Sequence, residues 1–117
     1  MNPGETIIGL DFGGHLWVIL SEVVDGQVVV TNLTTHGKAS CGTHCVVIAV
    51  GEHSYLRRDS CVYYRGATFN PVEPLRWAQA NGTLRQADPV STEVLNRIRA
   101  GVQASRFTSP RVRAAMP

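Results

Sequence analysis

The chain has 117 residues, 44% of them hydrophobic and 17% charged, with a formal net charge of +2. These values are ordinary for one globular domain with a real core, and we expect a single domain over residues 1–117. They exclude a membrane-spanning helix, because no apolar run approaches the roughly 18 residues that cross a bilayer. The start MNPGETIIG has no signal-peptide pattern, and the three cysteines are an odd number. We therefore expect a cytoplasmic protein without a disulfide scaffold.

The charge is divided unequally along the chain. Residues 1–56 hold one lysine and five acidic residues, for a net charge of −4. Residues 57–117 hold ten arginines, no lysine and four acidic residues, for a net charge of +6. Arginine binds phosphate and carboxylate groups through a planar fork, so this half favours an anionic partner such as RNA or an acidic protein segment. A solvated basic helix face is the structural alternative.

The N-terminal part, about residues 4–70, alternates short apolar runs with turn signals, as small antiparallel β domains do. Residues 16–21 form one strand, and Asp25-Gly26 makes the turn of a hairpin that continues into Val28–Val30. Further strands follow at residues 45–50 and 60–64. Because these runs are apolar at consecutive positions, the strands are buried on both faces or belong to a tightly curled sheet.

The composition changes at Asn70, and about 71–106 reads as helical. Asn70 is expected to cap a short helix over about 71–80, with Pro71 in its first position. Ser91 is expected to cap a second helix, whose apolar stripe consists of Val94, Leu95, Ile98 and Val102. Residues 107–117 are expected to form a frayed tail. The predicted architecture is mainly β, with a small curled β sheet or barrel followed by two short C-terminal helices.

His15 stands at the mouth of the most hydrophobic strand, directly after Gly13-Gly14. An imidazole titrates near neutral pH, so His15 is a candidate general acid or base. Thr34 and Thr35 end the hairpin, where a hydroxyl can donate a hydrogen bond to a phosphate oxygen. The structural alternatives are a satisfied histidine at a strand end and β-branched residues chosen for strand propensity.

The loop of residues 36–45 contains His36, Cys41, His44 and Cys45, which raises the question of zinc. Zinc sites usually combine two pairs of Cys or His ligands, and here a single loop supplies all of them. Cys45 also opens an apolar strand, where a free cysteine is normally buried. We therefore expect no bound metal and no other cofactor.

Residues 51–66, GEHSYLRRDSCVYYRG, interleave basic and aromatic side chains. This pattern suits single-stranded nucleic acid, whose bases stack and whose phosphates need cations. The alternative is an exposed basic turn followed by a strand with tyrosines at its rim. The candidate residues in this segment are His53, Arg57, Arg58, Ser60, Tyr64 and Arg65.

Three stretches, HLWVILS, VVVTNLTT and SCVYYRGATF, together resemble the PemK/MazF-like toxins of type II toxin–antitoxin systems. The resemblance covers about residues 4–70. It implies a curled SH3-like barrel (PemK/MazF/CcdB-like), a homodimer, metal-independent cleavage of single-stranded RNA and a neutralising antitoxin protein. In this chain His15-Leu16 stands where the family commonly has Arg-Pro, and the acidic residue that often follows the last core strand has no clear match in YYRGATF.

The resemblance places Thr34-Thr35 at the family's Thr-Ser position. Together with the proton-transfer chemistry of imidazole, this makes His15, Thr34 and His53 the expected catalytic residues. The expected RNA-binding residues are Arg57, Arg58, Ser60, Tyr64 and Arg65. The two histidines would exchange protons with the RNA, and cations would hold the phosphate. The alternative function is a non-catalytic SH3-like module that binds RNA or an acidic protein segment through its arginines.

Overall fold

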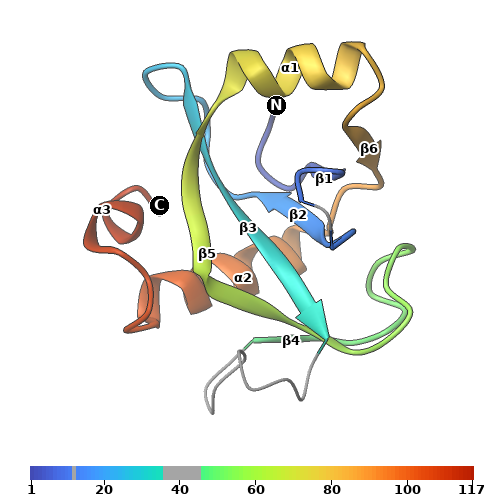
Figure 1. Ribbon diagram of the computed structural model, residues 1–117. Helices are drawn as coiled ribbons and strands as arrows, with labels where there is room; N and C mark the ends of the chain where they lie inside the picture. Colours follow the sequence, from blue (N-terminus) through green and yellow to red (C-terminus); the bar gives the residue numbers. More distant parts are fainter. Residues whose placement is uncertain (12, 36–45) are drawn as a thin grey trace.

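The computed structural model describes residues 1–11, 13–35 and 46–117. It is a mainly β fold in which a six-stranded antiparallel sheet curls into a half-barrel (Figure 1). The strand order across the sheet is β4-β5-β3-β2-β1-β6. The strands are β1 (Thr6–Ile8), β2 (Leu16–Ile19), β3 (Gln27–Thr35), β4 (Val47–Ile48), β5 (Ser60–Pro71) and β6 (Arg85–Ala87).

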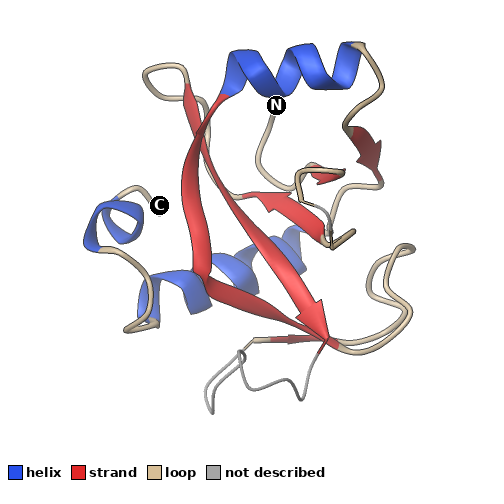
Figure 2. Ribbon diagram, in the orientation of Figure 1, coloured by secondary structure: helices blue, strands red, loops and turns tan. Residues whose placement is uncertain are grey.

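Helices lie on both sides of this sheet (Figure 2). They are α1 (Val72–Ala80), α2 (Thr92–Ala104) and α3 (Pro110–Ala114). The expectation of a curled β sheet with C-terminal helices is confirmed. Strands and helices are less strictly separated along the chain than expected, because β6 follows α1 in the sequence and pairs with β1 at the sheet edge.

The alternation of side chains in β2 explains why its sequence is apolar at every position. Leu16 and Val18 face a core that the sheet forms with α2 and α3. Trp17 and Ile19 face a second core, which the sheet forms with α1. Successive side chains in a strand point to opposite faces, so a strand between two cores needs no polar position. The prediction of burial on both faces is confirmed.

The hairpin between β2 and β3 forms at the predicted turn. Asp25 and Gly26 both have positive φ, at 52° and 73°. Val24 and Gln27 exchange two backbone hydrogen bonds across them, of 2.9 and 3.0 Å. Two positive φ angles twist the turn to match the twist of the strands, and Asp-Gly adopts them at low cost.

Strand β5 bends in the middle, and the bend curls the sheet (Figure 1). In the pairing of β3 with β5, Val30 lies opposite Thr68 while Asn32 lies opposite Tyr63, so β5 holds several residues that β3 does not match. Gly66 lies in this irregular segment, where a Cβ atom would come 2.4 Å from Asn32 Oδ1. An irregularity of this kind bends one strand and increases the local twist.

The helix ends confirm one predicted cap and correct another. The Ser91 hydroxyl accepts a hydrogen bond of 3.1 Å from the Val94 amide, and the predicted stripe of α2 is buried. In α1 the N-cap is Pro71, which makes no side-chain cap, so the prediction of an Asn70 cap was wrong. Strand β5 runs through Asn70 to Pro71, and the backbone passes directly into the helix.

The C-terminal residues are not a frayed tail. Ser109 caps α3 by accepting a hydrogen bond of 3.2 Å from the Val112 amide. Val112 and Met116 are 3% and 7% exposed and join the core under α2. In the sequence, one arginine and two alanines separate these two apolar residues.

Two further observations concern expectations from composition. In the described parts of the chain, no helix is both long enough and apolar enough to cross a bilayer. Cys61 is fully buried in β5 and disulfide-bonded, which the odd number of cysteines did not predict.

Close packing of α2 on β5 gives a test of the fold. A Cβ atom on Gly101 would lie 2.5 Å from Val46 Cγ2 and 2.8 Å from the Tyr64 hydroxyl. We expect Gly101→Ala to lower the free energy of unfolding by about 1–3 kcal/mol, because overpacking outweighs the gain in helix propensity of about 1 kcal/mol. Chemical denaturation measures this change. The control Asn96→Ala, at an exposed position of α2, should be neutral or stabilising. A stabilised Gly101→Ala protein would contradict the close contact.

Candidate functional site

The candidate site lies on the face of the sheet that α1 covers only in part. At the covered end, Val28 and Val30 of β3 pack against Val72 and Leu75. Asn32 and Thr34 continue the same face of β3, because side chains two residues apart in a strand share a face. Their surroundings form two adjoining hollows instead of a core.

His15 lies where the two hollows meet, since both His15 and Thr34 line each of them. The side chain of His15 is 38% exposed. Its Nδ1 lies 2.7 Å from Asp11 Oδ2, and its backbone N–H donates a hydrogen bond of 3.3 Å to Asp11 Oδ1. A carboxylate accepts only, so Nδ1 carries the hydrogen of this bond and Nε2 remains available to a ligand.

Gly13-Gly14 builds the turn that holds this pair. A Cβ atom on Gly13 would come within 2.7 Å of His15 Cε1, so the imidazole lies directly over the Gly13 backbone. Gly14 has a φ of +68°, which side-chain-bearing residues rarely adopt. Tyr55 donates a hydrogen bond of 2.5 Å to the Gly14 carbonyl and so connects this turn to the loop before β5.

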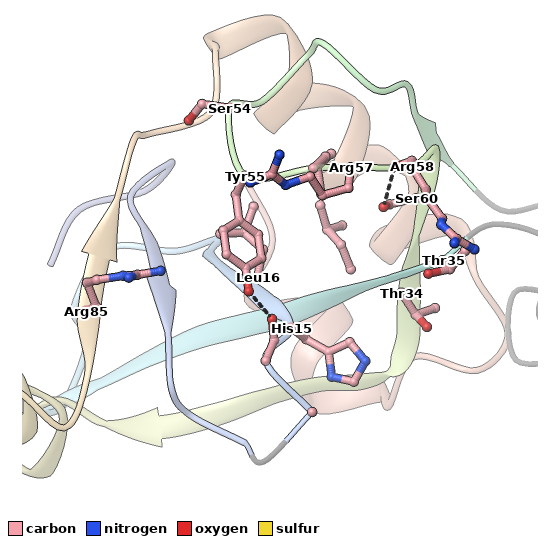
Figure 3. Close-up of a pocket in the computed structure, with 14 residues that line it drawn as sticks. His15, Leu16, Thr34, Thr35, Ser54, Tyr55, Arg57, Arg58, Ser60 and Arg85 are labelled. Atoms are coloured by element: carbon pink, nitrogen blue, oxygen red, sulfur yellow. Dashed lines mark hydrogen bonds between the residues drawn. The ribbon is translucent and has the colours of Figure 1, made fainter.

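The larger hollow has a volume of about 650 Å³ and is rich in cationic and hydroxyl side chains (Figure 3). Arg57 and Arg58 line it from the loop before β5, and Arg85 enters from β6 (Figure 3). All three arginines are exposed, and none forms an ion pair with a described residue. Thr34 and Thr35 lie on the same wall as Arg58 (Figure 3). This arrangement is suited to binding an anion.

His53 is not among the residues that line either hollow. It is 5% exposed, and its Nε2 donates a hydrogen bond of 2.5 Å to the Asp88 carbonyl. Its Nδ1 accepts a hydrogen bond of 3.1 Å from the Tyr55 amide. Both ring nitrogens are thus engaged with the backbone, and the contacts of His53 orient the loop that carries Tyr55 and Arg57.

The remaining candidates divide between the hollow and the rest of the fold. Ser60 lines the larger hollow but is 6% exposed and donates its hydroxyl to the Arg58 carbonyl at 3.1 Å. Tyr64 belongs to the core under α2, where its hydroxyl accepts a hydrogen bond of 2.8 Å from the Val46 amide. Arg65 stacks its guanidinium over the Phe107 ring at 4.5 Å. Neither Tyr64 nor Arg65 lines a hollow.

Sequence reasoning missed Asp11 and Arg85. Asp11 precedes His15 by four residues in DFGGH, and the two glycines between them were a signal that the chain turns back there. Arg85 carried no local signal. It reaches the site because β6 pairs with β1, with Arg85 opposite Ile8.

The pair with His15 changes the acidity of Asp11. Partial burial raises the pKa of Asp11, but the hydrogen bonds and the charge of His15 outweigh this effect, so the pKa lies below its usual value of 3.8. The buried indole nitrogen of Trp17 makes no hydrogen bond of normal geometry, although it lies close enough to lower the same pKa further. Asp11 therefore stays ionised at neutral pH and keeps accepting from Nδ1.

The described residues contain no group of three or more His, Cys, Asp or Glu side chains able to hold a metal ion. The cluster of His36, Cys41, His44 and Cys45 lies outside the described residues.

The lowered pKa of Asp11 predicts how stability depends on acid. A carboxylate with a lowered pKa in the folded state stabilises the fold above its unfolded pKa, and this contribution disappears as pH falls through the folded pKa. We expect Asp11→Asn to lose at most about 1 kcal/mol at neutral pH, since the pair is partly exposed. The difference from the parent should shrink below about pH 4.

Unfolding free energies measured from pH 2 to 7 check this expectation. Asp25→Asn, in the hairpin turn, is the matched control and should follow the parent curve. A constant difference between Asp11→Asn and the parent over the whole range would contradict the ionised pair.

Comparison of the chain with protein-family models and with curated proteins returned no match, so the geometry of the site and the resemblance noted above carry the functional argument.

Proposed function

We propose that the protein is a metal-independent endoribonuclease of toxin type that cleaves single-stranded RNA in the cytoplasm and is neutralised by an antitoxin protein. The observation that carries the proposal is the Asp11–His15 pair at the edge of a hollow lined by three arginines that form no ion pair with any described residue. This combination supplies an oriented imidazole and a cationic site for a phosphate within one cavity. The proposal includes an SH3-like identity for the curled sheet.

In the proposed reaction, His15 Nε2 removes the proton of an RNA 2′-hydroxyl. The 2′-oxygen attacks the adjacent phosphorus, the bond from phosphorus to the 5′-oxygen breaks, and a 2′,3′-cyclic phosphate forms. The imidazolium then gives its proton to the departing 5′-oxygen. Among the described histidines, His15 alone has a free ring nitrogen for both transfers, because both ring nitrogens of His53 are engaged elsewhere.

The other residues stabilise the charge that develops on the phosphoryl oxygens. Arg57, Arg58 and Arg85 supply the cations, and the hydroxyl of Thr34 supplies a neutral donor next to His15. Asp11 fixes the tautomer of His15 and stabilises the imidazolium that forms midway. The hydrogen bond from the Tyr55 hydroxyl to the Gly14 carbonyl holds the loop that carries Arg57 and Arg58 next to the turn that carries His15.

A binding module without catalysis is the second candidate. The three arginines of the larger hollow favour it, because they can bind an anionic segment without any proton transfer by His15. Under this reading RNA binds with strong salt dependence but stays intact.

The decisive test is cleavage of labelled single-stranded RNA by the purified protein in the presence of EDTA. We expect His15→Ala to reduce cleavage by roughly 100-fold or more, the usual scale for losing a general acid–base group. Gly13→Ala should reduce it by up to about 100-fold, because its Cβ displaces the imidazole and small displacements of this kind are costly. Both variants should retain the fold.

The controls separate the two candidates. Arg58→Gln should weaken both binding and cleavage, while Arg76→Gln, which removes an exposed arginine of α1, should change neither. A single-stranded DNA of the same sequence should bind and stay intact, because it lacks the attacking 2′-hydroxyl. Undiminished cleavage by His15→Ala would exclude the proposed base, and salt-dependent binding with no cleavage by the parent would favour the binding module.

The resemblance to PemK/MazF-like toxins also implies a homodimer. We expect light scattering to give a dimer mass at micromolar concentrations. A monomer mass across that range would remove this part of the proposal and leave the site chemistry standing.

A further inference from the structure

We propose that the smaller hollow beside His15 is a nucleobase subsite, which binds a base of the RNA whose phosphate lies among the arginines. This inference rests on the proposed function for its choice of RNA as the ligand. It assigns a role to Trp17, Asn32 and Tyr63, which the proposed cleavage chemistry does not use.

The strand register brings these three side chains together. Trp17 of β2 pairs with Asn32 of β3, and Asn32 pairs with Tyr63 of β5. Residues paired directly across strands have their side chains on the same face. The result is a row of aromatic, amide and aromatic side chains across three strands, and all three line the smaller hollow.

The size and lining of this hollow suit a flat ring. Its volume is about 330 Å³ and its walls are mainly apolar. Aromatic side chains bind bases by stacking, which is worth about 1–3 kcal/mol per base and tolerates any sequence. The larger hollow differs, because it is lined by arginines and hydroxyls.

Asn32 provides the polar contact that such a subsite needs. It is 7% exposed, and its side-chain amide has no hydrogen-bond partner among the described residues. Asparagine is depleted in strands, so this position is unusual. The amide is not among the fully buried polar groups without a partner, so it remains accessible from the hollow. The amide lines the hollow and offers one acceptor and two donors, which match the polar edge of a base.

Gly66 makes room for this arrangement. A Cβ atom there would lie 2.4 Å from Asn32 Oδ1 and 2.8 Å from Tyr63 Cδ2. The bend in β5 therefore opens the space in which the amide and the tyrosine ring border the hollow.

The position of the hollow links it to the phosphate site. His15 and Thr34 line both hollows, so a ligand that fills them passes directly over the imidazole. A nucleotide has this two-part character, with an apolar ring joined through a ribose to an anion. Inorganic phosphate or an acidic peptide would use the arginines and leave the aromatic row empty.

Binding of uncleavable RNA tests the inference without requiring catalysis. The probes are 2′-O-methyl tetranucleotides of each single base and an abasic tetranucleotide with the same number of phosphates. The Trp77→Phe protein leaves Trp17 as the one tryptophan, so its fluorescence reports on the hollow. We expect at least one base series to bind tenfold or more tightly than the abasic probe and to quench this emission.

Two variants separate the base from the phosphate. Tyr63→Leu and Asn32→Ser should bring the affinity for the favoured tetranucleotide near the abasic value and leave abasic binding unchanged. Arg58→Gln should weaken both probes by the same factor. If Tyr63→Leu does not fold, the Asn32→Ser variant and the comparison of probes on the parent chain still show whether the hollow binds a base.

Equal affinity of the parent for all probes, including the abasic one, would overturn the inference. A nucleoside monophosphate that binds as tightly as the tetranucleotides would overturn RNA as the source of the base. Base-dependent binding without any cleavage would support the subsite and contradict the endoribonuclease. Cleavage without base dependence would support the endoribonuclease and contradict the subsite.

Discussion

The pairing of β3 with β5 is the constraint on which the rest of the structure depends. These are the two longest strands, with nine and twelve residues, and they are paired almost throughout their length. They serve two cores because successive side chains of β3 point to opposite faces of the sheet. Strand β5 also bends in the middle, at the point where it gains residues that β3 does not match. One half of the pair holds the core under α1, and the other half supplies Asn32, Thr34 and Tyr63 to the open face. The site therefore arises from the same irregularity that curls the sheet.

Much of the fold could be predicted from the sequence because the patterns that specify it involve neighbouring residues. The Asp25-Gly26 turn, the cap at Ser91 and the apolar stripe of α2 each depend on neighbouring residues, and all three formed as predicted. The errors came from longer-range effects. Residues 110–114 form a helix because Val112 and Met116 reach a core built by distant strands, and Asn70 remains in β5 because its partner Val28 extends that strand.

The candidate site was readable only in part for the same reason. His15 and Thr34 were recognised at strand ends, and the structure brings them together. His53, Tyr64 and Arg65 lie in the same basic and aromatic segment as Arg57 and Arg58, but strand alternation and loop geometry direct them elsewhere. Arg85 reaches the hollow only through the pairing of β6 with β1, which no pattern near it in the sequence could indicate.

The edge strand β6 has a consequence for how copies of this chain can associate. Unpaired backbone groups along a sheet edge are a template on which another strand can add. Here that edge spans three residues, of which Arg85 and Gln86 are exposed. An incoming strand would gain few hydrogen bonds and would meet a fixed positive charge. Extension of the sheet into a continuous two-copy sheet, or into a growing fibril, is therefore disfavoured along β6, and the polarity of this edge is a safeguard against aggregation.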